Sequence, residues 1–205
     1  MIVLKSVFTF FFYAVVAIAA QNAVFTRALG VSRLVKLADE GPFALAKFTV
    51  LLTAIQMISA PLAFLANRLL IGFAYRAAVR PLVMVLCSGI AYLIVLLLVA
   101  LLTQKTSVKG LRDYITLLPM ATFNCCVLGT LLLTTIGGYS LLETLGFALG
   151  SSLGYALAIL LVNEGQRKIQ NRNVPSTFRG LPITLIYISI LALAVYGFTG
   201  HTPAF

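Results

Sequence analysis

The stretch LLPMATFNCCVLG, residues 117 to 129, decides the fold because it places polar groups inside a long apolar run. An amide, Asn124, and two adjacent thiols, Cys125 and Cys126, lie where a membrane segment would carry leucine. Burying an amide in hydrocarbon without a partner costs on the order of several kcal/mol, so Asn124 needs a hydrogen-bonding partner. A second asparagine, Asn22, interrupts the first apolar run in the same way.

The composition excludes a soluble domain. The chain is 61% hydrophobic and 10% charged, whereas soluble domains are about 45–50% apolar and about 25% charged. Its net charge of +10 would suit a nucleic-acid-binding protein only if the basic residues shared a solvated face. Here they fall between apolar blocks, which is the pattern of a polytopic membrane protein. We therefore expect no nucleic-acid partner.

Six apolar blocks are long enough for a span of about 20 residues. They run approximately Ile2–Ala20, Phe43–Ala66, Leu82–Leu102, Tyr114–Thr134, Leu141–Val162 and Leu181–Thr199. The first block ends in small residues, as signal peptides do. We expect it to be retained, because a five-span remainder would have no exported domain to justify a signal. The blocks predict an all-α polytopic membrane protein with a single integral membrane domain, residues 1–205.

The lysines and arginines divide unequally between the two sides of these blocks. One side receives Lys5, Arg68, Arg76 and Arg80. The other receives Arg27, Arg33, Lys36, Lys47, Lys105, Lys109, Arg112, Arg167, Lys168, Arg172 and Arg179. The positive-inside rule places the group of eleven in the cytoplasm, so both termini are predicted to lie outside.

The longest predicted loop, Asn163 to Gly180, has two interpretations. In the simpler one it is a solvated turn in which Pro175 ends a helix. In the other, Arg172 and Arg179 form a docking surface for a soluble partner or for anionic lipid headgroups.

The two halves of the chain share an irregularity. Asn22 and Asn124 are 102 residues apart, and each is followed within eight residues by a glycine, Gly30 or Gly129. Three spans in each half, about 1–103 and 104–205, would give the halves opposite orientations. This pattern is typical of an inverted repeat whose first and fourth helices are broken near the membrane midplane. From spacing alone, helix packing through the asparagines, worth about 0.6 kcal/mol each, explains them more simply.

The cysteines allow several interpretations. Cys87 is most simply a small hydrophobe. Cys125 and Cys126 would point about 100° apart on a regular helix, which makes a shared mononuclear site awkward. The only histidine, His201, lies in the tail, so we do not expect zinc. A single thiolate meeting ligands from another chain, as in an iron–sulfur cluster, remains open beside plain helix packing. Glu143, near the start of the fifth block, either favours a helix dipole or marks an ion pathway.

Two segments carry a resemblance to a known family. LLPMATFNCCVLG is similar to the fourth-helix motif of the A subunit of the Rnf complex and of its relative, the E subunit of the sodium-translocating NADH:quinone reductase. That motif is approximately Leu-Pro-Leu-Ile-x-x-Asn-Cys-Ala-Val/Ile-Leu-Gly. VPSTFRGLPITLIYISILALAVYGFTG resembles the family's closing segment. The matching residues are Leu118, Pro119, Asn124, Cys125, Val127, Leu128, Gly129, Val174, Pro175, Phe178, Gly180, Gly197, Phe198 and Gly200.

The resemblance implies a membrane subunit of a redox pump that couples electron transfer to movement of Na⁺ or H⁺ across a prokaryotic plasma membrane. Its partners would be a paralogous six-helix subunit of opposite orientation, flavin-bearing and ferredoxin-like subunits, and membrane lipid. The paired subunits would share a [2Fe–2S] cluster, with Cys125 as a ligand and Asn124 supporting the broken helix, as Asn22 would in the first half. The chain alone would not be a complete enzyme, because it carries no visible motif for NADH or flavin.

The first half departs from the family pattern. Where the family reads Leu-Gly-Leu-Cys-Pro, this chain reads Leu-Gly-Val-Ser-Arg, so Ser32 replaces the expected ligand. The missing ligand is then Ser32 itself, Cys126 from the second half, or nothing, in which case the chain is a cluster-free scaffold. A rival function is a small secondary transporter with Asn22 and Asn124 as substrate ligands. Cys125 beside Asn124 favours the redox subunit, because solute binding does not require a thiol.

Overall fold

The computed structural model describes residues 2–39, 42–105, 111–169 and 174–200, and these residues form helices without a strand. The longer elements are α1 (Ile2–Ile18), α2 (Val31–Asp39), α3 (Pro42–Leu69), α4 (Arg76–Lys105), α5 (Leu111–Thr122), α6 (Cys125–Ile136), α7 (Leu141–Ile169) and α8 (Leu181–Thr199). Two 3₁₀ turns, η1 (Leu70–Gly72) and η2 (Ser176–Phe178), precede α4 and α8. Lys109, Arg172 and His201 lie outside the described residues.

The helices confirm an all-α polytopic membrane protein. Within the described residues, four continuous helices are long and apolar enough to cross a membrane: α3 with η1, α4, α7 and α8. The α5–α6 pair, bent by 44°, counts as a fifth span if its two parts cross together. The first block gives only the 17-residue α1, about 25 Å long, whereas the hydrocarbon core is about 30 Å thick. Six spans and their inverted repeat therefore stay predictions.

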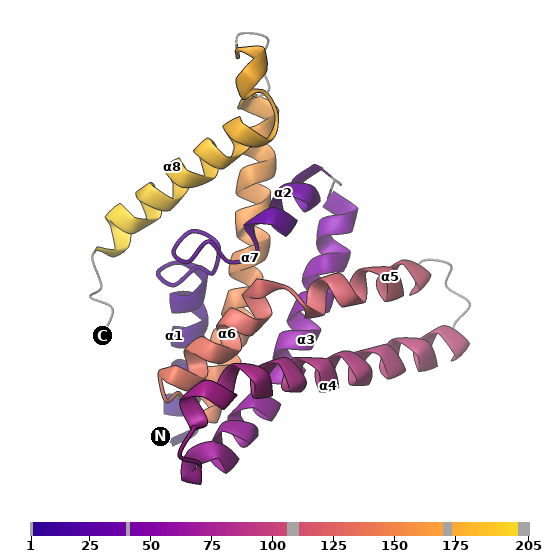
Figure 1. The fold of residues 1–205 in the computed structure, drawn as a ribbon, viewed down its shortest axis with the longest axis vertical. Helices are drawn as coiled ribbons and strands as arrows, with labels where there is room; N and C mark the ends of the chain where they lie inside the picture. Colours follow the sequence, from indigo (N-terminus) through magenta and orange to yellow (C-terminus); the bar gives the residue numbers. More distant parts are fainter. Residues whose placement is uncertain (1, 40–41, 106–110, 170–173, 201–205) are drawn as a thin grey trace.

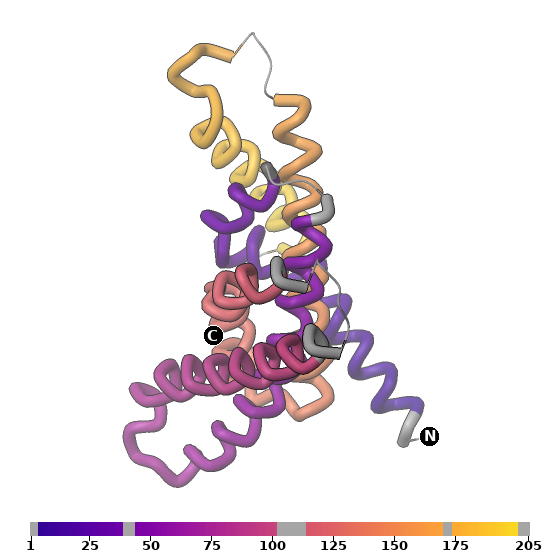
Figure 2. The backbone as a smooth tube through the Cα atoms, turned by 90° about the vertical axis from the view of Figure 1, so that its right-hand side faces the viewer, coloured from indigo at the N-terminus to yellow at the C-terminus, as the bar shows by residue number. Residues whose placement is uncertain are grey.

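Helix α7 lies at the centre of the molecule, with α1 along its first half and α3 beside it (Figures 1 and 2). The close contacts pair Phe10 with Gly146 and Ala14 with Gly150, so α1 and α7 run parallel. A Cβ atom at Gly150 would collide with the backbone carbonyl oxygen of Ala14. Small residues spaced by four are the usual way in which membrane helices bring their backbones together.

Helix α8 leaves the end of α7 and diverges from the rest of the chain (Figure 1). Of its residues, only Thr184 and Ile188 are buried, and Phe198 is 94% exposed. Its attachment is local: Gln166 donates a hydrogen bond to the Thr184 hydroxyl across 3.2 Å, and Tyr187 packs on Gly165. The apolar surface of α8 therefore faces lipid or another subunit.

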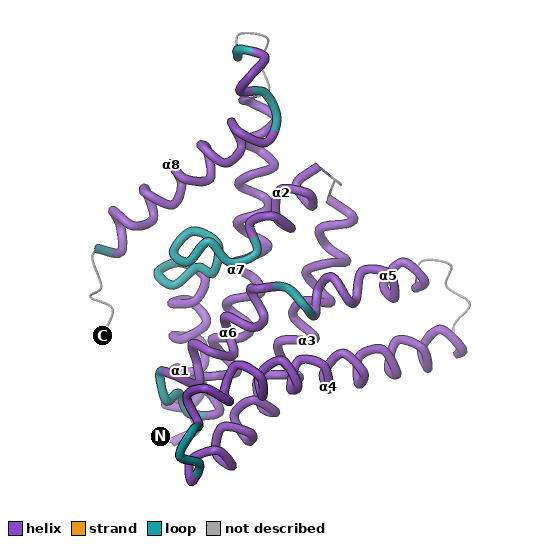
Figure 3. The backbone as a smooth tube through the Cα atoms, viewed as in Figure 1, coloured by secondary structure: helices purple, strands orange, loops and turns teal. Residues whose placement is uncertain are grey.

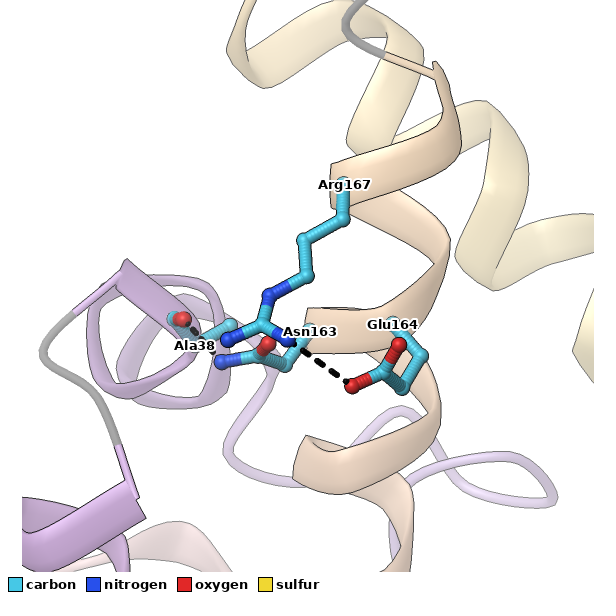
Figure 4. A network of polar contacts seen from close by, with 4 residues as sticks. All are labelled: Ala38, Asn163, Glu164 and Arg167. Carbon is cyan, nitrogen blue, oxygen red and sulfur yellow. Dashed lines mark hydrogen bonds and ion pairs between the residues drawn. The ribbon is translucent and has the colours of Figure 1, made fainter.

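The predicted loop from Asn163 to Gly180 is wrong in its first part, because α7 continues to Ile169. Asn163 donates a hydrogen bond of 2.6 Å to the carbonyl oxygen of Ala38, near the end of α2, where helical carbonyls lack partners within the helix (Figure 4). One turn further, Arg167 pairs with Glu164 across 3.3 Å. Glu164, Gln166, Arg167 and Lys168 are good helix formers and extend α7 beyond its apolar part. In the remaining turn, Arg179 donates to the carbonyl oxygen of Val174.

The close approach of the α1 and α7 backbones can be tested by substitution. Gly150→Ala should destabilise the protein by about 1–3 kcal/mol, the usual cost of overpacking, because the obstructing atoms belong to the backbone of α1. Gly89→Ala in α4 is the matched control, since a Cβ there meets no atom within 4 Å. It should be neutral or stabilising by up to about 1 kcal/mol through helix propensity. Thermal unfolding of both variants in one detergent measures the difference, and equal melting temperatures would contradict the packing.

Candidate functional site at two helix breaks

The break in the fourth apolar block is built by Asn124. Helix α5 ends at Thr122 and α6 begins at Cys125, with Asn124 extended between them at φ −78° and ψ 136°. The Asn124 Oδ1 atom accepts a hydrogen bond of 2.9 Å from the Cys126 N–H. An asparagine in this place caps the helix by accepting from one of the first free N–H groups. The amide in the apolar run thus satisfies the backbone that the break leaves open.

A second break follows α1, where the chain leaves the helix at Ile18 and runs through turns to α2 (Figure 3). Asn22 is buried at this break. Its Oδ1 atom accepts from the N–H groups of Val24 and Phe25, at 3.0 and 3.3 Å. Its Nδ2 atom donates to the carbonyl oxygens of Ile18 and Gly154, each at 3.0 Å. All four hydrogen-bonding positions of this amide are therefore used within the protein, which leaves none for a substrate ligand.

Tyr155 joins the two breaks. Its hydroxyl donates to the Gly30 carbonyl oxygen across 2.8 Å and accepts from Asn124 Nδ2 across 3.2 Å. Gly30 has a φ of +73°, and a Cβ atom there would lie 2.6 Å from Asn124 Oδ1, so the junction requires glycine. Gly129 in turn packs against Leu29. The two asparagines and two glycines that the sequence singled out therefore meet at one junction.

The junction lies at the middle of the 29-residue α7, where Gly154 and Tyr155 stand. Beside it, Thr26, Arg27 and Ala28 form an exposed, non-helical surface, and Ala28 has a φ of +53°. Arg27 forms no ion pair with any residue that the structure describes. Lipid tails cannot satisfy the hydrogen-bonding groups of non-helical backbone. This face must therefore be covered by protein or line an aqueous cavity.

The structure separates the two adjacent cysteines. Cys125, the first residue of α6, is exposed, and Cys126 is buried. Ser32, the second residue of α2, is also exposed, two residues beyond the Gly30 that Tyr155 holds. Cys125 and Ser32 thus begin the two helices that leave the junction, while Cys126 points into the protein. Cys87 is buried in α4, as expected of a small hydrophobe.

Cys126 belongs to a polar cluster between α3, α6 and α7 that the sequence did not reveal. Its Sγ atom lies 3.5 Å from Ser151 Oγ and 3.6 Å from Gln56 Nε2. Thr130 Oγ1 lies 2.7 Å from Ser151 Oγ and donates to the carbonyl oxygen of Cys126. These partners occupy the thiol, so Cys126 is poorly placed to meet ligands from another chain. Among the described residues, no group of three His, Cys, Asp or Glu side chains gathers around a metal position.

Comparison with known proteins places the chain in a family. A family model described as an Rnf-Nqr subunit, membrane protein, matches residues 10–202. The chain belongs to the Rnf-Nqr family of membrane subunits. The resemblance read from the Asn124 motif and the closing segment is thereby confirmed.

Several relatives carry the name of an A subunit. The chain is 26% identical to the A subunit of the Na⁺-translocating ferredoxin:NAD⁺ oxidoreductase complex of Acetobacterium woodii, across 94% of this chain and 97% of the relative. It is 38% identical to the A subunit of the ion-translocating oxidoreductase complex of Syntrophotalea carbinolica, but over only 52% of this chain and 55% of that one. The corresponding protein of Shewanella amazonensis is 30% identical over 72% of this chain and 75% of its own length.

Glu143 has a structural role in this Rnf-Nqr protein. Its carboxylate accepts a hydrogen bond of 2.8 Å from the Ser140 N–H, and the Ser140 hydroxyl accepts from the Glu143 N–H at 3.5 Å. This reciprocal pair caps the start of α7. It favours the helix-dipole interpretation of Glu143 over an ion pathway.

Removing the Tyr155 hydroxyl tests whether it joins the two helix breaks. Tyr155→Phe keeps the ring but leaves the Gly30 carbonyl and the Asn124 amide without this partner, which should cost about 1–3 kcal/mol. Tyr92→Phe is the control, because the Tyr92 ring contacts Phe123 while its hydroxyl bonds to no described residue. Thermal unfolding of the full chain compares the two. A Tyr155→Phe variant as stable as Tyr92→Phe would contradict the bridging role.

Proposed function

We propose that the chain is one of two paired membrane subunits in an ion-translocating electron-transport complex, and that the junction of its two broken helices is the face on which a paralogous subunit docks. The observation that carries this proposal is the exposure of Cys125 at mid-span depth, beside the non-helical segment around Arg27. The names of the relatives support it, since the Acetobacterium woodii protein belongs to a sodium-translocating complex. Flavin-bearing and ferredoxin-like subunits would supply the other redox centres.

Docking at this face satisfies groups that lipid leaves without partners. The partner would cover the backbone around Ala28 and supply an anionic or polar group to Arg27. Because Asn22 and Asn124 already bond within the chain, the junction is rigid before the partner arrives. A secondary transporter would need free polar groups at the same place, and Asn22 offers none.

The donor groups at the junction fit half of a shared [2Fe–2S] site. Such a cluster takes four protein ligands, of which the partner would provide two. The Cys125 thiol and the Ser32 hydroxyl are both exposed, whereas Cys126 bonds to Ser151 inside the protein. The bound cluster would supply one-electron transfer within the membrane. Asn124 fixes the backbone before Cys125 by capping the start of α6.

We further propose the inverted repeat, with halves of about 1–103 and 104–205 and both termini outside the prokaryotic plasma membrane. Each half would contain one broken helix, α1 with α2 and α5 with α6, followed by two continuous spans. The parallel course of α1 and α7 supports this topology, because the first and fifth spans must cross in the same direction. The excess of lysine and arginine on one side supports the orientation.

Thiol labelling tests the docking face. In the isolated chain, an alkylating reagent should modify Cys125 and leave Cys126 unmodified, since only Cys125 is exposed. In the native complex Cys125 should become protected. Cys125→Ala and Cys126→Ala variants, both with Cys87→Ala, assign the signal to each thiol. If Cys125 reacts equally fast in the complex and in isolation, the face is not an interface between subunits.

Iron content tests the ligand assignment. In the purified complex, Cys125→Ala and Ser32→Ala should each abolish the visible absorbance of this centre, and Cys126→Ala should retain it. Ser32→Cys should restore the family ligand and raise the reduction potential, because a thiolate is a softer ligand than an alkoxide. Loss of the absorbance in Cys126→Ala alone would reverse the assignment. A wild-type complex that assembles without iron here would show that the chain serves as a scaffold.

A further inference from the structure

The connection between α3 and α4, residues 68–80, has a composition that neither the fold nor the redox site explains. We call it the α3–α4 turn. Every residue from 71 to 78 is exposed, and the turn projects from the lower end of the molecule in both views (Figures 1 and 2). Its exposed apolar side chains are Leu69, Ile71, Phe73 and Tyr75, of which Leu69 is 85% exposed. Interleaved with them are three arginines, Arg68, Arg76 and Arg80.

These arginines lack acidic neighbours. The sequence contains no Asp or Glu from residue 41 to residue 112, and the structure describes no ion pair for any of the three. Arg76 and Arg80 are four residues apart on α4, so they share a helix face and repel each other. The Arg80 Nε atom is buried without a hydrogen-bond partner among the described residues. The α3–α4 turn therefore carries positive charge without a neighbouring carboxylate, and its Arg80 Nε–H donor has no hydrogen-bond partner among the described residues.

The placement of the charge is also unusual. On the side predicted to be extracytoplasmic, the chain carries four cations, and three of them lie in this one turn. The positive-inside rule disfavours arginine on that side. Glu143, which lies on the same predicted side, is engaged with the Ser140 N–H at the start of α7. No described carboxylate balances the charge of the turn, so the turn attracts an anion from outside the chain.

We propose that the α3–α4 turn is a binding site for an anionic phospholipid. The planar guanidinium groups of Arg76 and Arg80 suit the oxygens of a phosphate, which they can bind in a bidentate manner. The turn also lies at the start of α4, where the positive end of the helix dipole adds to the attraction for an anion. Phe73 and Ile71 enter the acyl region, and Tyr75 takes the interfacial depth that amphipathic rings prefer.

The third arginine completes the site from α3. Arg68 lies over the ring of Phe64, with its guanidinium carbon 5.2 Å from the ring centroid. This contact holds the cation near the end of the apolar part of α3, at the depth of the headgroups. One lipid is thus held by charge at its phosphate and by apolar side chains along its acyl chains, without requiring any other protein chain.

The absence of tryptophan from the chain makes a direct experiment possible. Phe73→Trp places a single fluorescent reporter in the turn, and Phe198→Trp places one on exposed α8 at the same predicted side. The full chain carrying either reporter is reconstituted in phosphatidylcholine vesicles that contain a fraction of brominated phosphatidylglycerol. The matched vesicles contain the same fraction of brominated phosphatidylcholine. Bromine quenches tryptophan on contact, so the ratio of quenching measures lipid preference at each position.

The expected result is a preference for phosphatidylglycerol at Phe73→Trp that is severalfold larger than at Phe198→Trp. Removing the charge with Arg76→Gln and Arg80→Gln should abolish the difference, since each arginine near a headgroup contributes up to about fivefold in affinity. Lys5→Gln, a cation on the same predicted side but outside the turn, should leave it unchanged. Raising the salt concentration should also reduce this difference in lipid preference. The salt experiment needs no substitution in the turn, so it applies even if the arginine variants fold poorly.

Three outcomes would overturn the proposal. Equal preference at the two reporters would mean that the bilayer attracts the whole cationic protein and that the turn binds no particular lipid. A preference that survives both arginine substitutions and high salt would mean that the guanidinium groups do not bind the phosphate. No preference at Phe73→Trp would mean that the turn is occupied by zwitterionic lipid or by none.

Discussion

A polar group in the membrane interior must find its hydrogen-bonding partner inside the protein, and this constraint shapes the centre of the molecule. Two asparagines enter apolar blocks, and each one replaces the helical bonds that a break removes. Asn22 also reaches the carbonyl of Gly154, and Asn124 reaches the Tyr155 hydroxyl. Because both breaks are fixed to the middle of α7, they meet at one depth and form one junction.

The hydrogen-bonding groups of Asn22 are satisfied within the chain, but one face of the junction remains exposed. Asn22 has no hydrogen-bonding capacity left, whereas Cys125, Ser32 and Arg27 remain exposed. An exposed thiol beside exposed non-helical backbone is typical of a membrane protein whose surroundings are supplied by another chain. Membership of the Rnf-Nqr family agrees with this, since its members are membrane subunits.

The same criterion, a hydrogen-bond partner within the chain, separates polar groups with a structural role from those that could bind another molecule. Glu143 stands at the start of α7, and Asn163 in α7 reaches the end of α2; both satisfy backbone there, so they require no function beyond folding. Cys126, Thr130 and Ser151 bond to one another and hold α6 on α7. The arginines of the α3–α4 turn form no ion pair with any described residue, and in our proposal lipid phosphates supply the missing anions.

Much of the fold was predictable from local sequence. The bounds of α8 agree with the predicted block, Leu181–Thr199, and the need of Asn124 for a hydrogen-bonding partner followed from the cost of burying its amide. Hydropathy misses the extension of α7 to Ile169 because it ends a span where polar residues begin, although such residues continue a helix readily. The first block predicts a full span because its hydropathy continues beyond Ile18, where the helix ends.

The sequence by itself determined most of the helical segments, the two asparagines that interrupt them, and the family to which the chain belongs. Each of these follows from a pattern within a short window: apolar length, an amide in an apolar run, or a motif. Only the tertiary structure decided that Tyr155 joins Gly30 to Asn124, and that Cys125 faces outward while Cys126 faces Ser151. These outcomes depend on contacts between residues far apart in the chain, 125 residues in the case of Tyr155 and Gly30. A local pattern predicts that a polar group needs a hydrogen-bonding partner, whereas tertiary packing determines which residue that partner is.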